Sequence, residues 1–132
     1  MAVGLSAVNN ANKYLALLHR GVAWTPPAGN YLATHIGDPG SAGTANASGT
    51  TTRMQVTWAT ESGGSISSNN TPTWTSWAGG SQTLSHLSEW DVVTAGSGNF
   101  LESYALTTSK AIANGDTFTV TTLTHSQAPI AA

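Results

Sequence analysis

The sequence Thr117-Phe118-Thr119-Val120-Thr121 decides the class of fold, because two apolar residues alternate in it with three threonines. Successive side chains of a β-strand point to opposite faces, so this stretch places Phe118 and Val120 on a buried face. Five earlier segments are also rich in Thr, Val, Trp, Tyr and Phe and are separated by turn residues: 30–36, 53–59, 72–78, 83–92 and 100–106. With a last strand at 117–124, they predict a mainly β protein built as an antiparallel sandwich or barrel. Of these we expect a jelly-roll-like β-sandwich.

The first 21 residues follow a helical period instead. The apolar residues that recur at this spacing, or widen the same stripe, are Val3, Leu5, Ala7, Val8, Ala11, Tyr14, Leu15 and Leu18. Ser6 can cap the start of a helix and Gly21 can end it, so we expect one amphipathic N-terminal helix of about four turns. The expected organisation is a single domain, 1–132, with the helix in 1–21, the sandwich in 30–125 and a tail in 126–132.

Composition restricts the function more than any single motif. Only 8% of the 132 residues are charged, against about a quarter in an average soluble domain, and the net charge is −2. With four basic side chains, an electrostatic hold on nucleic-acid phosphates is not expected. The absence of cysteine excludes thiolate catalysis and cysteine-ligated metal centres. The longest apolar-leaning stretch, near Tyr14–Leu18, is far shorter than the ~20 residues that cross a bilayer, so membrane insertion is not expected.

The sequence HIGDPGSAGT at 35–44 could form an active-site loop or a tight bend. A phosphate-binding loop needs a following helix and a lysine in reach, yet no lysine lies between Lys13 and Lys110. Calcium needs several carboxylates at alternating positions, and Asp38 stands alone. Asp-Pro-Gly is a common turn sequence, because Pro fixes φ and Gly accepts positive φ. The stretch therefore predicts a bend after the first strand.

No other group of residues meets the demands of a catalytic or metal site. The four histidines match no zinc-binding spacing, and we expect ordinary half-buried side chains at His19, His35, His86 and His125. Glu89 and Asp91 share a strand face by the two-residue period, which we interpret as a solvated face rather than a catalytic pair. Ser97 lacks the nucleophile-elbow pattern and falls in a predicted hairpin turn. We therefore expect no catalytic residue, no cofactor and no metal.

Surface contacts are the alternative to chemistry. Trp74 and Trp77 in PTWTSW could stack on sugar rings, fill the core or centre a subunit interface, and core or interface is the favoured interpretation. Leu5, Leu15 and Leu18 cannot all face one small sheet, so some of them should meet a neighbouring subunit. These five residues are the candidate interface or glycan contacts.

Four stretches in a fixed order cover nearly the whole chain: VGLSAVNNANKYLALL (3–18), THIGDPGSAGTAN (34–46), TRMQVTWA (52–59) and LSHLSEWDVVTAGSGNFLESYALTTSKAIANGDTFTV (84–120). Together they resemble a family of small bacteriophage virion proteins commonly described as tail or tail-fibre proteins. The positions that match the family pattern are Gly37–Gly40, Gly43-Thr44, Arg53, Trp58, Trp90, Leu106 and Gly115-Asp116. The sequence departs from the pattern at Ala47, Thr51 and Ser97-Gly98, where the family usually has Glu, Tyr and Gly-Gly.

The resemblance implies a non-enzymatic structural subunit of a phage virion, in the first place a minor tail or tail-fibre-associated protein. A capsid decoration protein and a carbohydrate-binding module for host attachment are the alternatives. The implied partners are further copies of the chain, with a trimer as the first expectation, and other virion proteins. The implied location is the virion, assembled in the host cytoplasm.

Overall fold

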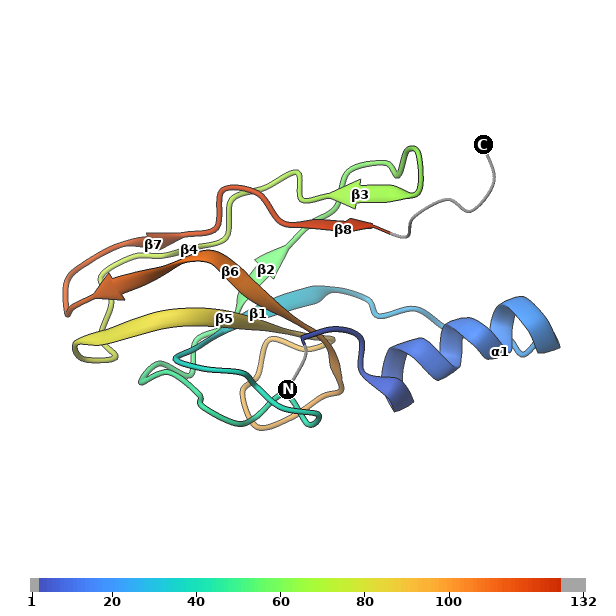
Figure 1. Cartoon of the computed structure of the whole chain (residues 1–132), viewed down its shortest axis with the longest axis horizontal. Helices are drawn as coiled ribbons and strands as arrows, with labels where there is room; N and C mark the ends of the chain where they lie inside the picture. The colour runs from blue at the N-terminus through green and yellow to red at the C-terminus, as the bar shows by residue number, and fades with distance from the viewer. Residues whose placement is uncertain (1–2, 127–132) are drawn as a thin grey trace.

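The computed structural model describes residues 3–126. A π-helical turn, η1 (Ala7–Ala11), continues into helix α1 (Asn12–Arg20). The strands that follow are β1 (Asn30–His35), β2 (Met54–Val56), β3 (Ser65–Ser67), β4 (Thr73–Trp74), β5 (Gln82–Trp90), β6 (Phe100–Ile112), β7 (Phe118–Thr119) and β8 (Thr124–Ser126). The described chain is mainly β with antiparallel sheets and one N-terminal helix (Figure 1), which confirms the predicted class of fold.

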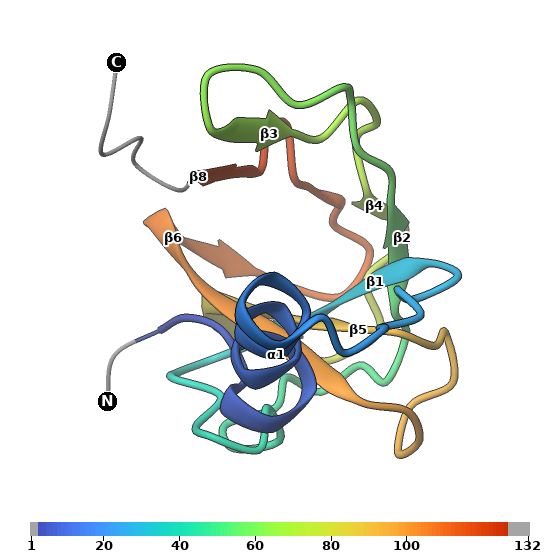
Figure 2. The same cartoon turned by 90° about the vertical axis from the view of Figure 1, so that its right-hand side faces the viewer.

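The strands form two layers. A four-stranded antiparallel sheet has the order β2-β1-β5-β6, and β5 lies inside it between β1 and β6. The two-stranded sheets β3-β8 and β4-β7 lie over one face of this sheet, as Figure 1 and Figure 2 show. Two facing layers agree with the predicted sandwich, and its jelly-roll connectivity stays a prediction.

The hydrophobic core fills the space between the layers. Its buried side chains come from both layers: Leu32, Val56, Leu84, Leu87 and Ile112 on the larger sheet, and Trp74, Trp77, Phe118, Val120 and Leu123 on the other side. The rings of Trp74 and Phe118 pack with their centroids 5.5 Å apart. Phe118 and Val120 are 6% and 7% exposed, while Thr117, Thr119 and Thr121 face outward. The alternation in 117–121 is therefore confirmed.

The strand boundaries depart from the prediction at several places: the predicted strand at 117–124 is divided into β7 and β8, and the one at 53–59 shortens to β2. β6 runs past the predicted end at Leu106 to Ile112, because β5 continues to pair with it beyond an irregularity in which 106–109 stand opposite Ser85. The predicted strand at 72–78 shortens to β4, since Ser76 adopts a positive φ of 51°. β3 was not predicted, because its strand character comes from pairing with β8 and not from an alternating sequence.

The helix begins and ends at the predicted residues but differs in between. The Ser6 hydroxyl accepts a hydrogen bond from the Asn9 N–H, and Gly21 ends α1 with a φ of 64°. The first turn is π-helical, which shifts the side-chain period that the sequence suggested. Leu5 was wrongly placed on the helix: it lies before the cap and forms an isolated antiparallel bridge with Glu102 on β6.

Candidate functional site

Helix α1 carries a large exposed apolar surface. It extends away from the end of the sheet (Figure 1), and neither η1 nor α1 contains a buried residue. Leu15 and Leu18 are 51% and 61% exposed, Leu17 is 45% exposed, and Val8 on η1 is 68% exposed. Exposed apolar patches of this kind mark interaction sites in soluble proteins, so α1 is the first candidate for a contact surface.

The apolar residues of α1 share one side of the helix. At 100° per residue, Tyr14, Leu15, Leu17 and Leu18 occupy one continuous arc. Three residues with basic side chains lie on the opposite arc: Lys13, His19 and Arg20. An α-helix with this division buries its apolar side against another surface. Leu15, Leu17 and Leu18 are the most exposed part of this arc and are available to a partner, whereas Tyr14 also lines a cavity with Trp24 and Trp58.

The base of the helix is fixed to the sheet edge. The Ser6 N–H donates to the Leu101 carbonyl at 2.7 Å, and the Ser103 N–H donates to the Gly4 carbonyl at 3.0 Å. The Asn9 side chain adds a hydrogen bond to the Phe100 carbonyl at 3.1 Å. These bonds satisfy part of the outer edge of β6. They hold the N-terminal end of the helix while its apolar arc stays exposed.

Trp74 and Trp77 belong to the core. Each is 3% exposed, and their indole N–H groups donate to the carbonyls of Thr52 and Gly80, both at 2.9 Å. Of the interpretations left open for these residues, core packing is the one the structure supports. The hypothesis that they stack on a sugar is wrong, because neither ring offers a free face.

The HIGDPGSAGT stretch forms the predicted bend after β1. One carboxylate oxygen of Asp38 accepts a hydrogen bond from the Gly40 N–H at 2.7 Å, and this bond lowers the pKa of the Asp38 carboxyl. His35 is 2% exposed rather than half-buried, with its ring nitrogens 2.8 Å from the Ala45 carbonyl and 2.7 Å from the Ser88 hydroxyl. Burial lowers the pKa of His35, so its ring is a neutral structural group.

Glu89 and Asp91 do not share a solvated face, so that expectation is wrong. Glu89 is only 5% exposed, and it lies in the part of β5 from Leu87 to Trp90 that is buried on both faces. Asp91 lies beyond β5, where its carboxylate accepts hydrogen bonds from the backbone and side chain of Asn99, both at 2.7 Å. The sequence did not indicate that Glu89 is buried, because its burial depends on the neighbouring strands.

A network of polar side chains surrounds Glu89. The Tyr104 hydroxyl donates to Glu89 at 2.5 Å and lies 3.2 Å from Glu102, and Asn30 donates to the other Glu89 oxygen. His125 Nδ1 lies 3.1 Å from the other carboxylate oxygen of Glu102, Oε1. Burial raises the pKa of both glutamates. The cluster joins four strands, and the sequence alone could not assemble it.

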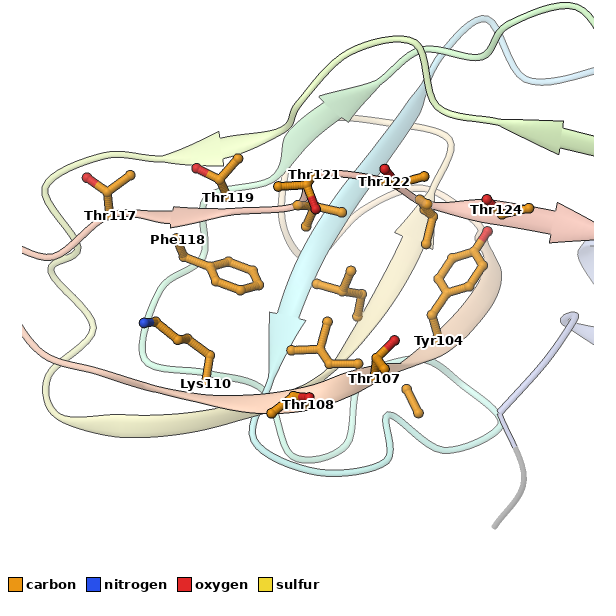
Figure 3. A pocket seen from close by; sticks show the side chains of 15 residues that line it. Tyr104, Thr107, Thr108, Lys110, Thr117, Phe118, Thr119, Thr121, Thr122 and Thr124 are labelled. Carbon is orange, nitrogen blue, oxygen red and sulfur yellow. The ribbon is translucent and has the colours of Figure 1, made fainter.

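A threonine-lined groove of about 620 Å³ separates β6 from the segment 117–124. Figure 3 shows Thr107 and Thr108 on one side of this groove and Thr117, Thr119 and Thr122 on the other. Its titratable side chains are Lys110 and Tyr104, and burial raises the pKa of Tyr104. Phe118 points into the groove while Thr117 and Thr119 point away from it (Figure 3), so the inner wall is largely apolar and the hydroxyl groups lie at the outer rim.

Two classes of site are absent from residues 3–126. No three His, Asp or Glu side chains gather there in a way that could hold a metal ion. In the same residues, no helix is long and apolar enough to span a bilayer. Contact surfaces are what the described chain presents most clearly.

The described chain is a mainly β protein with a projecting helix whose apolar side is exposed. A comparison with known families identifies the family of the chain: residues 4–126 match the family described as podophage GP4 fiber I protein gp80. The match covers nearly the whole sequence, so the chain belongs to this phage fibre family and is a virion component. The resemblance to tail-fibre proteins is confirmed. No curated protein matches the sequence.

Proposed function

We propose that the chain is a non-enzymatic structural subunit of the phage tail, as a minor tail or fibre-associated protein that assembles through helix α1. The observation that carries the proposal is the uncovered apolar arc on a helix whose base is fixed to the sheet. Its family membership supports contacts with other virion proteins. The single domain that we expect for 1–132 would be the unit of assembly.

The energetics of the arc favour association. Full burial of one leucine side chain contributes about 1.5–3 kcal/mol, and Leu15, Leu17 and Leu18 are each about half exposed. The same helix in several copies can bury these side chains around a rotation axis, where each copy contacts its two neighbours head to tail and the ring closes. A trimer is the first expectation. The low charge of the chain adds little repulsion between copies.

The location in the particle is tested by electron microscopy of virions labelled with an antibody against this protein. Label on the tail or its fibres supports the proposal. Label spread over the capsid would instead identify a decoration protein, and absence of the protein from purified virions by mass spectrometry would overturn the structural role.

The role of the helix is tested in phage that carries Leu15→Asp together with Leu18→Asp. The charged helix should no longer incorporate into virions, because its arc cannot be buried against a partner. Val93→Asp is a matched control, since Val93 is 55% exposed in the loop between β5 and β6. Equal incorporation of both variants would show that α1 is not the assembly surface.

A further inference from the structure

A second cavity lies beside the base of the helix. It has a volume of about 340 Å³, which is within the usual size of small-molecule sites. Four aromatic side chains contribute to its wall: Tyr14, Trp24, Trp58 and Tyr104. Trp24 and Trp58 are half-buried, unlike the core tryptophans, and Tyr14 is 38% exposed. Trp58 and Tyr104 also pack against the hydrophobic core, so the aromatic surface that the core leaves to the cavity comes from Trp24, Tyr14 and the exposed part of Trp58.

The polar groups of the cavity are fixed in position. Glu89 is held by Asn30 and Tyr104, and Glu102 is held by Tyr104 and His125. The Tyr104 hydroxyl has one proton, which it donates to Glu89, so the Glu102 oxygen beside it keeps its acceptor capacity; an ionised carboxylate has about four acceptor sites. Acceptors that are already oriented lose little freedom when a ligand donates to them.

This lining selects the chemistry of a ligand. Two carboxylates repel an anion. Their oxygens are hydrogen-bond acceptors that lie close together, which favours a ligand with several hydroxyl donors. The aromatic wall favours a molecule that also has a flat C–H face. Each carboxylate already lies beside polar groups of the chain, Asn30 and Tyr104 at Glu89 and His125 at Glu102, so the cavity does not present two bare charges to a cation. A neutral pyranose sugar has all the required features.

We propose that the cavity lined by Tyr14, Trp24, Trp58, Glu89 and Glu102 binds a neutral sugar residue. Trp24 and Trp58 provide surfaces for the C–H face of the ring, and the glutamates accept from its hydroxyls. The site is distinct from Trp74 and Trp77, which the core occupies. The inference concerns the isolated protein and does not rest on assembly through α1.

The experiment uses saturation-transfer NMR and calorimetry on the 132-residue chain with neutral methyl glycosides of glucose, galactose and N-acetylglucosamine. At least one glycoside should bind saturably, with transfer strongest at the ring C–H protons. Absence of saturable binding for all three overturns the proposal. Tighter binding of tetramethylammonium than of every glycoside also overturns it, because that result identifies a cation site.

Matched variants locate the binding. Trp24→Ala should weaken it at least about tenfold, which corresponds to about 1.4 kcal/mol, and Trp24→Phe should retain most of it. Glu102→Gln keeps the shape of the side chain and should weaken binding several-fold. An unchanged affinity in both Trp24→Ala and Glu102→Gln overturns the assignment to this cavity. Should Trp24→Ala unfold, Tyr14→Ala on the exposed helix serves in its place.

Discussion

The β body, residues 30–126, and helix α1 place their apolar side chains in opposite ways. In the body, Leu32 and Leu84 are fully buried between two layers of strands. In α1, Leu15 and Leu18 are more than half exposed, although the helix sequence also separates an apolar side from a polar side. The difference shows that a regular apolar period predicts burial but not the surface that provides it. In the body that surface belongs to the same chain, and for α1 we infer that it belongs to a partner.

The largest expected effect is the loss of stability when Leu84, in the core of the β body, is shortened. Leu84→Ala should destabilise the isolated protein by about 2–5 kcal/mol, because it leaves a cavity in the core. Leu18→Ala should change the stability of the monomer by less than about 0.5 kcal/mol, as an exposed residue does. Denaturant unfolding measures both values. Equal losses would show that the helix is packed against the body in solution.

A second substitution tests how tightly the body packs around the bend at 35–44. A Cβ on Gly43 would lie 2.3 Å from the Phe100 ring, and Gly43 has a φ of 72°. We expect Gly43→Ala to cost about 2–4 kcal/mol, from backbone strain together with overpacking. Gly96 has a φ of 77° and open space around its Cβ position, so Gly96→Ala reports the strain alone. Similar melting temperatures for the two variants would contradict the packing contribution.

Arg53 tests whether a charge can organise the body. Its Nη1 lies 2.9–3.0 Å from the carbonyl oxygens of Val92, Thr94 and Ser97, and its guanidinium lies 4.1 Å from the centre of the Trp90 ring. Arg53→Lys should lower stability by about 1–3 kcal/mol, because the ammonium cannot reproduce both contacts. Hydrogen exchange in the loop 91–99 should accelerate. Unchanged exchange there would exclude Arg53 as its support.

The smallest effect is a dependence on pH. Burial raises the pKa of Glu102, and Glu89 raises it further while His125 opposes both. A carboxyl with a raised pKa in the folded state stabilises the fold below about pH 4, and this contribution is lost as the pH rises through the raised pKa. The wild type should therefore lose stability relative to Glu102→Gln as the pH rises above about 4. Parallel stability curves would contradict the burial of this carboxyl.

The sequence was most informative where one residue decides a local structure. Ser6 and Gly21 bound the helix, Asp38 and its neighbours form the bend, and Phe118 alternates with threonines, all as predicted. Capping, turn chemistry and strand alternation act over a few residues, so a sequence can encode them visibly.

Features that depend on other elements could not be predicted. Glu89 is buried because β6 places Glu102, its pairing partner, and Tyr104 beside it. β3 becomes a strand only through its pairing with β8. Trp24 and Trp58 meet at one cavity although a long segment of chain separates them. Such sites arise from pairings that are distant in sequence, and no local pattern reports them.

Sedimentation of the isolated protein tests the central inference, that the exposed arc of α1 is an assembly surface. At high micromolar concentration the wild type should form a discrete oligomer. The Leu15→Asp, Leu18→Asp double variant should sediment as a monomer with an unchanged β-sheet spectrum, and Val93→Asp should behave like the wild type. A wild-type monomer at that concentration, or an oligomer that survives the double substitution, would contradict the account.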